Sequence, residues 1–169
     1  MASPSAGLSG NQKEQRKLTC RRALITGLTL WGLVLAGAAQ CAAQSFTSFD
    51  VPGSTLTFAQ SINDDGAITG HWISSGFTHG FLRDPDGTIT SFGPPDSTGT
   101  APQSINSSGA ITGYYFGPSG GHGFLRDPDG TITCLDAPGP IGTFPLSIND
   151  SGAITGYVFL NGNHGFVFQ

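Results

Sequence analysis

The chain has 169 residues, with 7 Lys or Arg, 11 Asp or Glu, 26 Gly and 11 Pro. Residues 44–169 contain ten Asp, two Arg and neither Lys nor Glu, so this segment is acidic by about eight charges. It lacks the cations that neutralise phosphates, which excludes nucleic acid and anionic membrane surfaces as expected partners. The composition indicates one Gly-rich domain with few helix-favouring residues.

Residues 1–43 have the pattern of an export signal. A basic segment at 13–22 precedes an uncharged apolar stretch at 23–39, which is followed by small residues. We predict cleavage after Ala43, with Ala39 as the alternative, and a secreted or periplasmic chain without membrane attachment after cleavage. The pair Arg21-Arg22 resembles a twin-arginine motif, so both the general secretory (Sec) route and the twin-arginine route stay open. Cleavage after Ala43 would leave Cys134 as the sole cysteine, unable to form an intrachain disulfide.

Residues 44–169 contain three copies of one pattern, spaced 43 residues apart. The segment Ser-Ile-Asn-Asp-Asp-Gly-Ala-Ile-Thr-Gly at 61–70 recurs with small changes at 104–113 and 147–156. A second block at 79–90 recurs unchanged at 122–133, and its first three residues recur at 164–166. We therefore define three structural repeats at about 54–96, 97–139 and 140–169.

Each repeat is expected to form four short antiparallel strands. The Asn-x-x-Gly and Asp-Pro-Asp-Gly segments supply the residues that tight turns need, and no window between them is long enough for an amphipathic helix. The predicted fold is all-β, with β-propeller-like blades, because the repeat length is that of a blade. A β-trefoil-like threefold fold is the alternative.

The sequence does not decide whether the three repeats close into a ring, because known propellers have about four to eight blades. Two chains forming a six-bladed homodimeric ring, an open array and a trefoil each fit three repeats. The third repeat lacks its fourth strand, and residues 46–53 resemble the fourth strands of the other two. We expect residues 46–53 to complete the third repeat and remove an exposed sheet edge.

The pattern Ser-Ile-Asn-x-x-Gly-Ala-Ile-Thr-Gly, followed by His-Gly-Phe-Leu and Asp-Gly, resembles the HAF-repeat family of extracellular bacterial proteins. The match covers nearly all of residues 46–169, with Gly80, Gly123 and Gly165 where the family usually has Ala. The resemblance implies export and a propeller-like all-β fold, and it implies no established activity.

Functional residues are expected where the repeats differ, because the repeated residues are explained by the repeated fold. The three variable loops carry aromatic side chains that suit a sugar ring or a protein surface. The candidate ligand-binding residues are Trp72, Phe77, Tyr114, Tyr115, Phe116, Tyr157 and Phe159. The predicted function is an exported, non-enzymatic module that binds a protein or a carbohydrate. The alternatives are a trefoil-like lectin with repeated sugar sites and an extracellular hydrolase without a recognisable motif.

Metal binding is the weaker interpretation of the remaining motifs. His79, His122 and His164 occupy one position in the three repeats, and a closed threefold fold could bring them together as a zinc-type ligand set. A His beside Gly in every repeat more often orders a turn, so we predict no cofactor. The Asp-Pro-Asp-Gly segments resemble the start of a calcium loop but lack its closing Glu.

Overall fold

The computed structural model describes residues 45–139 and 142–169, so the predicted export signal lies outside the described residues. Eleven strands form one mixed sheet, and this part of the chain contains no helix. The all-β class predicted from the repeats is confirmed. Within the described ranges, no helix is long and apolar enough to cross a membrane.

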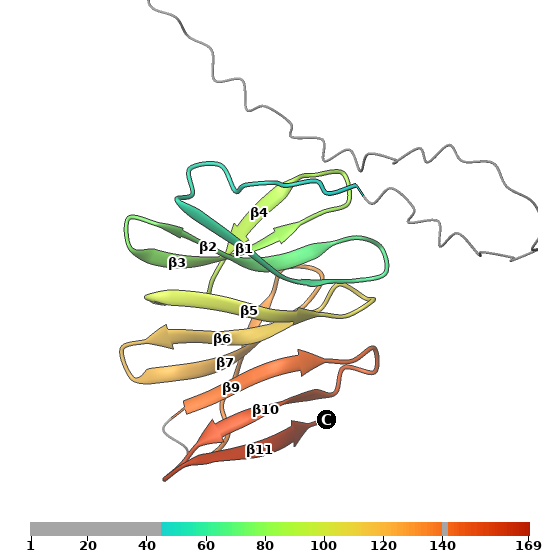
Figure 1. Cartoon of the computed structure of the whole chain (residues 1–169). Helices are drawn as coiled ribbons and strands as arrows, with labels where there is room; N and C mark the ends of the chain where they lie inside the picture. The colour runs from blue at the N-terminus through green and yellow to red at the C-terminus, as the bar shows by residue number, and fades with distance from the viewer. Residues whose placement is uncertain (1–44, 140–141) are drawn as a thin grey trace, which may run out of the picture. The chain divides into compact units, whose positions relative to one another are not determined.

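The strands follow the repeats along the chain (Figure 1). The first repeat contains β1 (Leu56–Ile62), β2 (Ile68–Ser74), β3 (Phe77–Arg83) and β4 (Ile89–Phe92). The second contains β5 (Gly99–Ile105), β6 (Ile111–Gly117), β7 (Gly120–Arg126) and β8 (Ile132–Leu135). The third contains β9 (Gly142–Ile148), β10 (Ile154–Phe159) and β11 (Asn163–Phe168).

Neighbouring strands within a repeat pair antiparallel, and consecutive repeats are joined by parallel contacts. β3 pairs with β5 at Thr78 and Gly99, and β7 pairs with β9 at Gly121 and Gly142. The sheet runs in chain order from β1 to β11, while β4 and β8 branch from it and pair with β3 and β7. The sheet is open. No closed propeller and no trefoil barrel forms among the described residues, so of the arrangements left open by the sequence the trefoil alternative is not observed.

Residues 46–53 lie at the first repeat rather than the third. The Phe49 ring packs edge to face against Phe81, with 6.0 Å between ring centroids, and the Arg83 guanidinium lies over Phe49. Phe92 in β4 makes the matching contact with Phe124 of the second repeat, at 6.1 Å. Each fourth segment therefore covers the repeat that follows it, so residues 46–53 cover the start of the array instead of closing it.

The repeated Asn forms the turn between the first two strands and also joins neighbouring repeats. Gly66 N donates to Asn63 O (3.0 Å), and Ala67 N donates to Asn63 Oδ1 (2.9 Å). Asn63 Nδ2 donates to Asn106 O in the second repeat at 3.1 Å, and Asn106 Nδ2 donates to Asn149 O in the third at 3.1 Å. One side chain thus satisfies backbone groups in two turns.

The buried side chains lie between repeats rather than inside them. Phe124 and Ile111 are fully buried, and partly buried side chains from the first repeat, Leu82 and Phe92, pack against them. A second cluster joins Ile148 and Ile154 of the third repeat to residues of the second. A single repeat cannot bury its apolar face alone, so stability comes from the contacts between neighbours.

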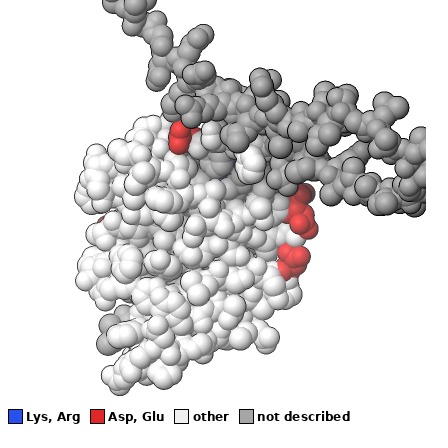
Figure 2. All heavy atoms as spheres, in the orientation of Figure 1, with Lys and Arg blue, Asp and Glu red and all other residues white. Residues whose placement is uncertain are grey.

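Charge is sparse on the face of the molecule shown in Figure 2, where Asp side chains appear only toward its margins. This distribution agrees with the composition of residues 44–169, in which most of the Asp residues belong to turns. The described residues on this face are therefore mostly uncharged.

Candidate functional site

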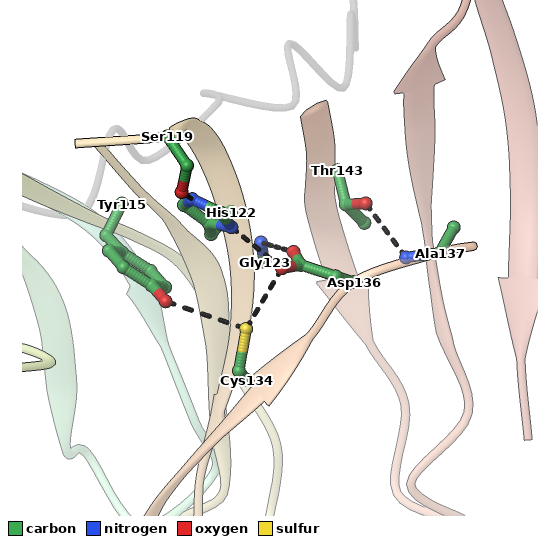
Figure 3. Close-up of polar contacts among 8 residues, drawn as sticks. All are labelled: Tyr115, Ser119, His122, Gly123, Cys134, Asp136, Ala137 and Thr143. Atoms are coloured by element: carbon green, nitrogen blue, oxygen red, sulfur yellow. Dashed lines mark hydrogen bonds and ion pairs between the residues drawn. The ribbon is translucent and has the colours of Figure 1, made fainter. Parts of the chain in front are cut away.

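The second repeat brings a histidine, a cysteine and an aspartate together (Figure 3). His122 lies on β7, Cys134 lies on β8, and Asp136 follows β8 directly. His122 Nδ1 is 2.7 Å from Asp136 Oδ2, and Cys134 Sγ donates to the same Oδ2 at 3.2 Å. One potential ligand atom from each side chain lies within 4.8 Å of the other two. We call these three residues the polar cluster.

Strand pairing places these groups. Tyr115 and His122 face each other across β6 and β7, so their rings stack with centroids 5.1 Å apart. Gly123 pairs with Leu135 across β7 and β8, which puts Asp136 beside His122. Gly123 N donates to Asp136 Oδ1 at 3.3 Å, leaving Oδ2 to the imidazole and the thiol.

Two hydroxyl groups complete the surroundings of the polar cluster. Ser119 Oγ is 2.8 Å from His122 Nε2, and Tyr115 OH donates to Cys134 Sγ at 3.5 Å. Burial raises the pKa of Tyr115 to about 12, helped by its contact with Cys134 and the charge of Asp136. Burial also raises the pKa of Cys134, as do its bond to Asp136 and the charge of that carboxylate. Both groups are therefore protonated at neutral pH.

The other two repeats share the histidine, and the first repeat has different residues at the remaining positions of the polar cluster. His79 stacks on Trp72 with centroids 4.6 Å apart, and Trp72 Nε1 donates to Ser91 Oγ at 3.1 Å. His164 Nε2 contacts Leu160 O at 3.0 Å. In the first repeat, the positions of Ser119, Cys134 and Asp136 hold Gly76, Ser91 and Gly93.

The three repeated histidines do not meet. His79, His122 and His164 lie on β3, β7 and β11, and two strands of the sheet separate each from the next. The arrangement imagined for a closed threefold fold is absent because the described repeats follow one another along an open sheet. Of the three, only His122 belongs to a group of three potential metal ligands among the described residues.

The predicted aromatic residues divide between the two sides of the sheet, because successive side chains of a strand point in opposite directions. Trp72 and Tyr115 stack on histidines, as described above. Tyr114 and Tyr157 lie on the other side, where Phe144 joins them at centroid distances of 5.3 Å and 4.9 Å. Phe144 was missed because its segment lies before the recognised repeat motif. Phe116 also contacts Tyr114, and Phe77 and Phe159 are exposed.

The ring of His71 extends this aromatic side into the first repeat. It stacks on Phe58 with centroids 4.9 Å apart. Burial lowers the pKa of His71, so its imidazole is neutral at neutral pH. We call Phe58, His71, Tyr114, Phe144 and Tyr157 the aromatic face, an uncharged surface that crosses all three repeats.

The contacts of Ser119, His122 and Asp136 follow the order of a Ser-His-Asp triad. In such a triad a buried Asp holds the imidazole, which activates the Ser hydroxyl. Here the Asp136 side chain is 41% exposed, and the Cys134 thiol shares its Oδ2. Ser119 is exposed at the turn between β6 and β7. This arrangement suits ligand binding better than nucleophilic catalysis.

Sequence reasoning found His122 and Tyr115 but missed Cys134, Asp136 and Ser119 as their partners. The only signal was that Cys134 and Asp136 stand where the first repeat has Ser91 and Gly93, in the variable segment that follows the identical block. In comparisons with protein-family models and with curated proteins, nothing matches this chain. The resemblance to the HAF-repeat family therefore stays a prediction.

Proposed function

We propose that residues 45–169 form an exported, non-enzymatic interaction module whose two ends bind another β-repeat unit, with a second copy of this chain as the partner. In this proposal each repeat acts as a propeller-like blade, and two chains complete a six-bladed ring. The observation that carries the proposal is a difference in burial. Residues at the two ends of the row of three repeats are exposed, whereas the equivalent residues between repeats are buried.

The first repeat exposes residues that its neighbours bury. The side chain of Ile62 is 64% exposed, whereas its equivalents Ile105 and Ile148 are each 6% exposed. Leu56 and Phe58 on the same strand are also exposed. Among residues 45–139 and 142–169, β1 ends the strand order of the sheet, and no repeat packs on its outer side as the preceding repeats pack on β5 and β9.

The third repeat likewise exposes residues that are buried at the same positions of the first two repeats. Phe166 is only partly buried, whereas Phe81 and Phe124 at the same position are fully buried. Val167 is 69% exposed, and Thr155 is exposed where Thr69 and Thr112 are fully buried. Among the described residues β11 is the last strand of the sheet, and no further repeat packs against this end.

The hydrogen bonds between repeats indicate how two ends could join. Asn106 Nδ2 donates to Asn149 O, and Ile148 N donates to Ser104 Oγ at 3.3 Å. The same bonds occur one repeat earlier. One further step along the array would match Asn149 and Ser147 with the Asn63 carbonyl and Ile62 amide of another chain. The residues 46–53 of that chain, which cover its own first repeat, would then lie beside β11, as β4 lies beside β3 and β8 lies beside β7. Such a head-to-tail contact closes into a ring or continues as a filament.

Charge introduced at either end is expected to prevent this assembly. We expect the purified protein to sediment as a concentration-dependent oligomer, and Ile62→Lys and Val167→Lys each to sediment as a monomer. Burying an unpaired ammonium in an apolar contact is strongly unfavourable. The matched control is Thr90→Lys on the exposed side of β4, which should assemble as the unmodified chain does. Assembly that survives both end variants would contradict the proposal, as would equal loss in the control.

Carbohydrate binding by the aromatic face is the second candidate function. The stacked rings of Phe144 and Tyr157, with Tyr114 against them, form a continuous aromatic surface that suits sugar rings. We expect binding on a glycan array to be lost in Tyr157→Ala. It should be kept in Trp72→Ala, because the His79 ring already packs against the Trp72 ring. The reverse pattern would move the sugar site to the opposite side of the sheet.

A further inference from the structure

We propose that the polar cluster is a binding site for a divalent cation that accepts mixed nitrogen, sulfur and oxygen ligands, with Zn²⁺ as the representative. The ligands are His122 Nδ1, Cys134 Sγ and Asp136 Oδ2, and solvent fills the remaining position. The site lies within one repeat, so it does not depend on assembly of the ends.

The ligand set suits this class of cation. Imidazole, thiolate and carboxylate are the groups that bind zinc in proteins, at metal–ligand distances of about 2.0–2.3 Å. A thiolate and a carboxylate together neutralise the charge of a divalent ion. Calcium and magnesium prefer sites made of oxygen ligands, so the thiol and imidazole argue against them.

The distances between ligand atoms fit with small movements. In a tetrahedral site, neighbouring ligand atoms are roughly 3.3–3.7 Å apart. The pairs here are 2.7 Å and 3.2 Å apart, with all three atoms within 4.8 Å. The His122 Nδ1 and Asp136 Oδ2 atoms must separate by about 0.6–1.0 Å to reach this spacing, and the exposed side chains of Cys134 and Asp136 have room to move that far. Their exposure also gives the cation and its water a route from solvent.

The surrounding contacts hold each ligand in a suitable orientation. Ser119 Oγ lies beside Nε2 of His122, so it can accept a hydrogen bond from the Nε2–H group. The unprotonated Nδ1 then faces the cation. Gly123 N holds Oδ1 of Asp136 and turns Oδ2 toward the other ligands. Ala137 N donates to Thr143 Oγ1 at 3.1 Å, which fixes the backbone after Asp136 (Figure 3).

Binding displaces the protons that hold the polar cluster together without a metal. The Cys134 thiol proton is released to solvent, and the sulfur binds as thiolate. His122 binds as the neutral imidazole with its proton on Nε2. The contacts between Asp136 Oδ2 and the other two ligands are replaced by bonds from all three atoms to the cation.

The first repeat provides an internal comparison. His79 occupies the same position in its repeat as His122 and stacks on an aromatic ring in the same way. Ser91 and Gly93 replace the thiol and the carboxylate there. A metal that merely sought exposed histidines would bind both repeats, whereas the proposed site selects the second.

The test is titration of the purified full chain with Zn²⁺ alone by calorimetry, with Co²⁺ as a spectroscopic probe of thiolate ligation. We expect one Zn²⁺ per chain, and a Co²⁺ complex with thiolate charge-transfer absorption. Cys134→Ser, Asp136→Asn and His122→Gln should each weaken binding by at least the roughly 10–100-fold that loss of a supporting residue costs. Cys134→Ser should also remove the charge-transfer absorption, although Cys20 and Cys41 stay in that variant.

His79→Gln is the matched control and should bind Zn²⁺ as the unmodified chain does. Circular dichroism of every variant checks that the sheet is retained. The proposal is overturned if Zn²⁺ does not bind, if binding is unchanged in Cys134→Ser and Asp136→Asn, or if His79→Gln weakens it equally. Ester hydrolysis that disappears in Ser119→Ala, without Zn²⁺ binding, would overturn it in favour of a catalytic triad.

Discussion

Replacing Phe124 with alanine is expected to lower the free energy of unfolding by about 3–5 kcal/mol, the cost of removing a large side chain from a core. Phe124 is fully buried, packs edge to face with Phe92 and contacts the cluster that joins the first two repeats. The ring thus fills space shared by two repeats, and its loss leaves a cavity that neither repeat can fill alone. Urea or guanidinium denaturation followed by circular dichroism measures the effect.

Phe166→Ala is the matched control for this prediction. Phe166 is the equivalent residue of the third repeat and is only partly buried. We expect its removal to cost about 1–2 kcal/mol, since the penalty follows the apolar area taken from water. Equal losses at the two positions would show that the third repeat is covered as completely as the second. If the two losses are equal only while the protein is assembled, and the loss at Phe166 becomes smaller on dilution, a partner chain covers Phe166.

Gly113→Ala is expected to lower the free energy of unfolding by about 3 kcal/mol or more, which is the upper range for overpacking. A Cβ on Gly113 would overlap the Ala101 carbonyl oxygen and lie 2.7 Å from Pro102 Cα. These are backbone atoms next to the irregularity between Pro102 and Ser104, so no side-chain rotation relieves the clash. The Gly that ends each Ile-Thr-Gly motif is thus required by the close approach of two strands.

Gly99→Ala provides the comparison. A Cβ there would meet the Thr78 Cβ at 3.7 Å, an ordinary contact. We expect a change within about 1 kcal/mol, because alanine also restricts the unfolded chain. Denaturation midpoints of the two variants measure the difference. A Gly113→Ala protein as stable as the Gly99→Ala protein would mean that β5 and β6 lie farther apart than the structure places them.

The strands and turns could be predicted from the sequence because they depend on local residues. The turn at Asn63 and Gly66 and the Asp84–Gly87 turn form where the motifs indicate, with Gly87 N donating to Asp84 O at 2.9 Å. Identical local sequences give identical local structures in the first two repeats. Exact repetition also indicates which residues serve the fold, so the positions that differ between repeats are the candidates for a binding site.

The relation between repeats could not be predicted in the same way. Whether an array closes depends on the angle at which one repeat follows another, and no single motif encodes that angle. Residues 46–53 resemble a fourth strand in every case, so their sequence alone fits the first repeat as well as the third. The contact between Phe49 and Phe81 shows that these residues pack against the first repeat.

The polar cluster was hidden for a related reason. His122 and Asp136 are 14 residues apart, and only the pairing of β7 with β8 brings them together. The sequence showed Cys134 as an isolated thiol and Asp136 as one acidic residue among ten. Both residues follow the block that the first two repeats share, and most of their neighbours there also differ between the repeats, so the differences at Cys134 and Asp136 did not stand out.

The mass of the purified protein in solution, measured by light scattering coupled to size exclusion over a range of concentrations, tests the central claim most directly. The exposed ends at Ile62 and Val167 predict a species of twice the mass of one chain, as two chains close a ring of six repeats. A monomer at every concentration would contradict the claim and show that the open ends of the sheet do not bind each other.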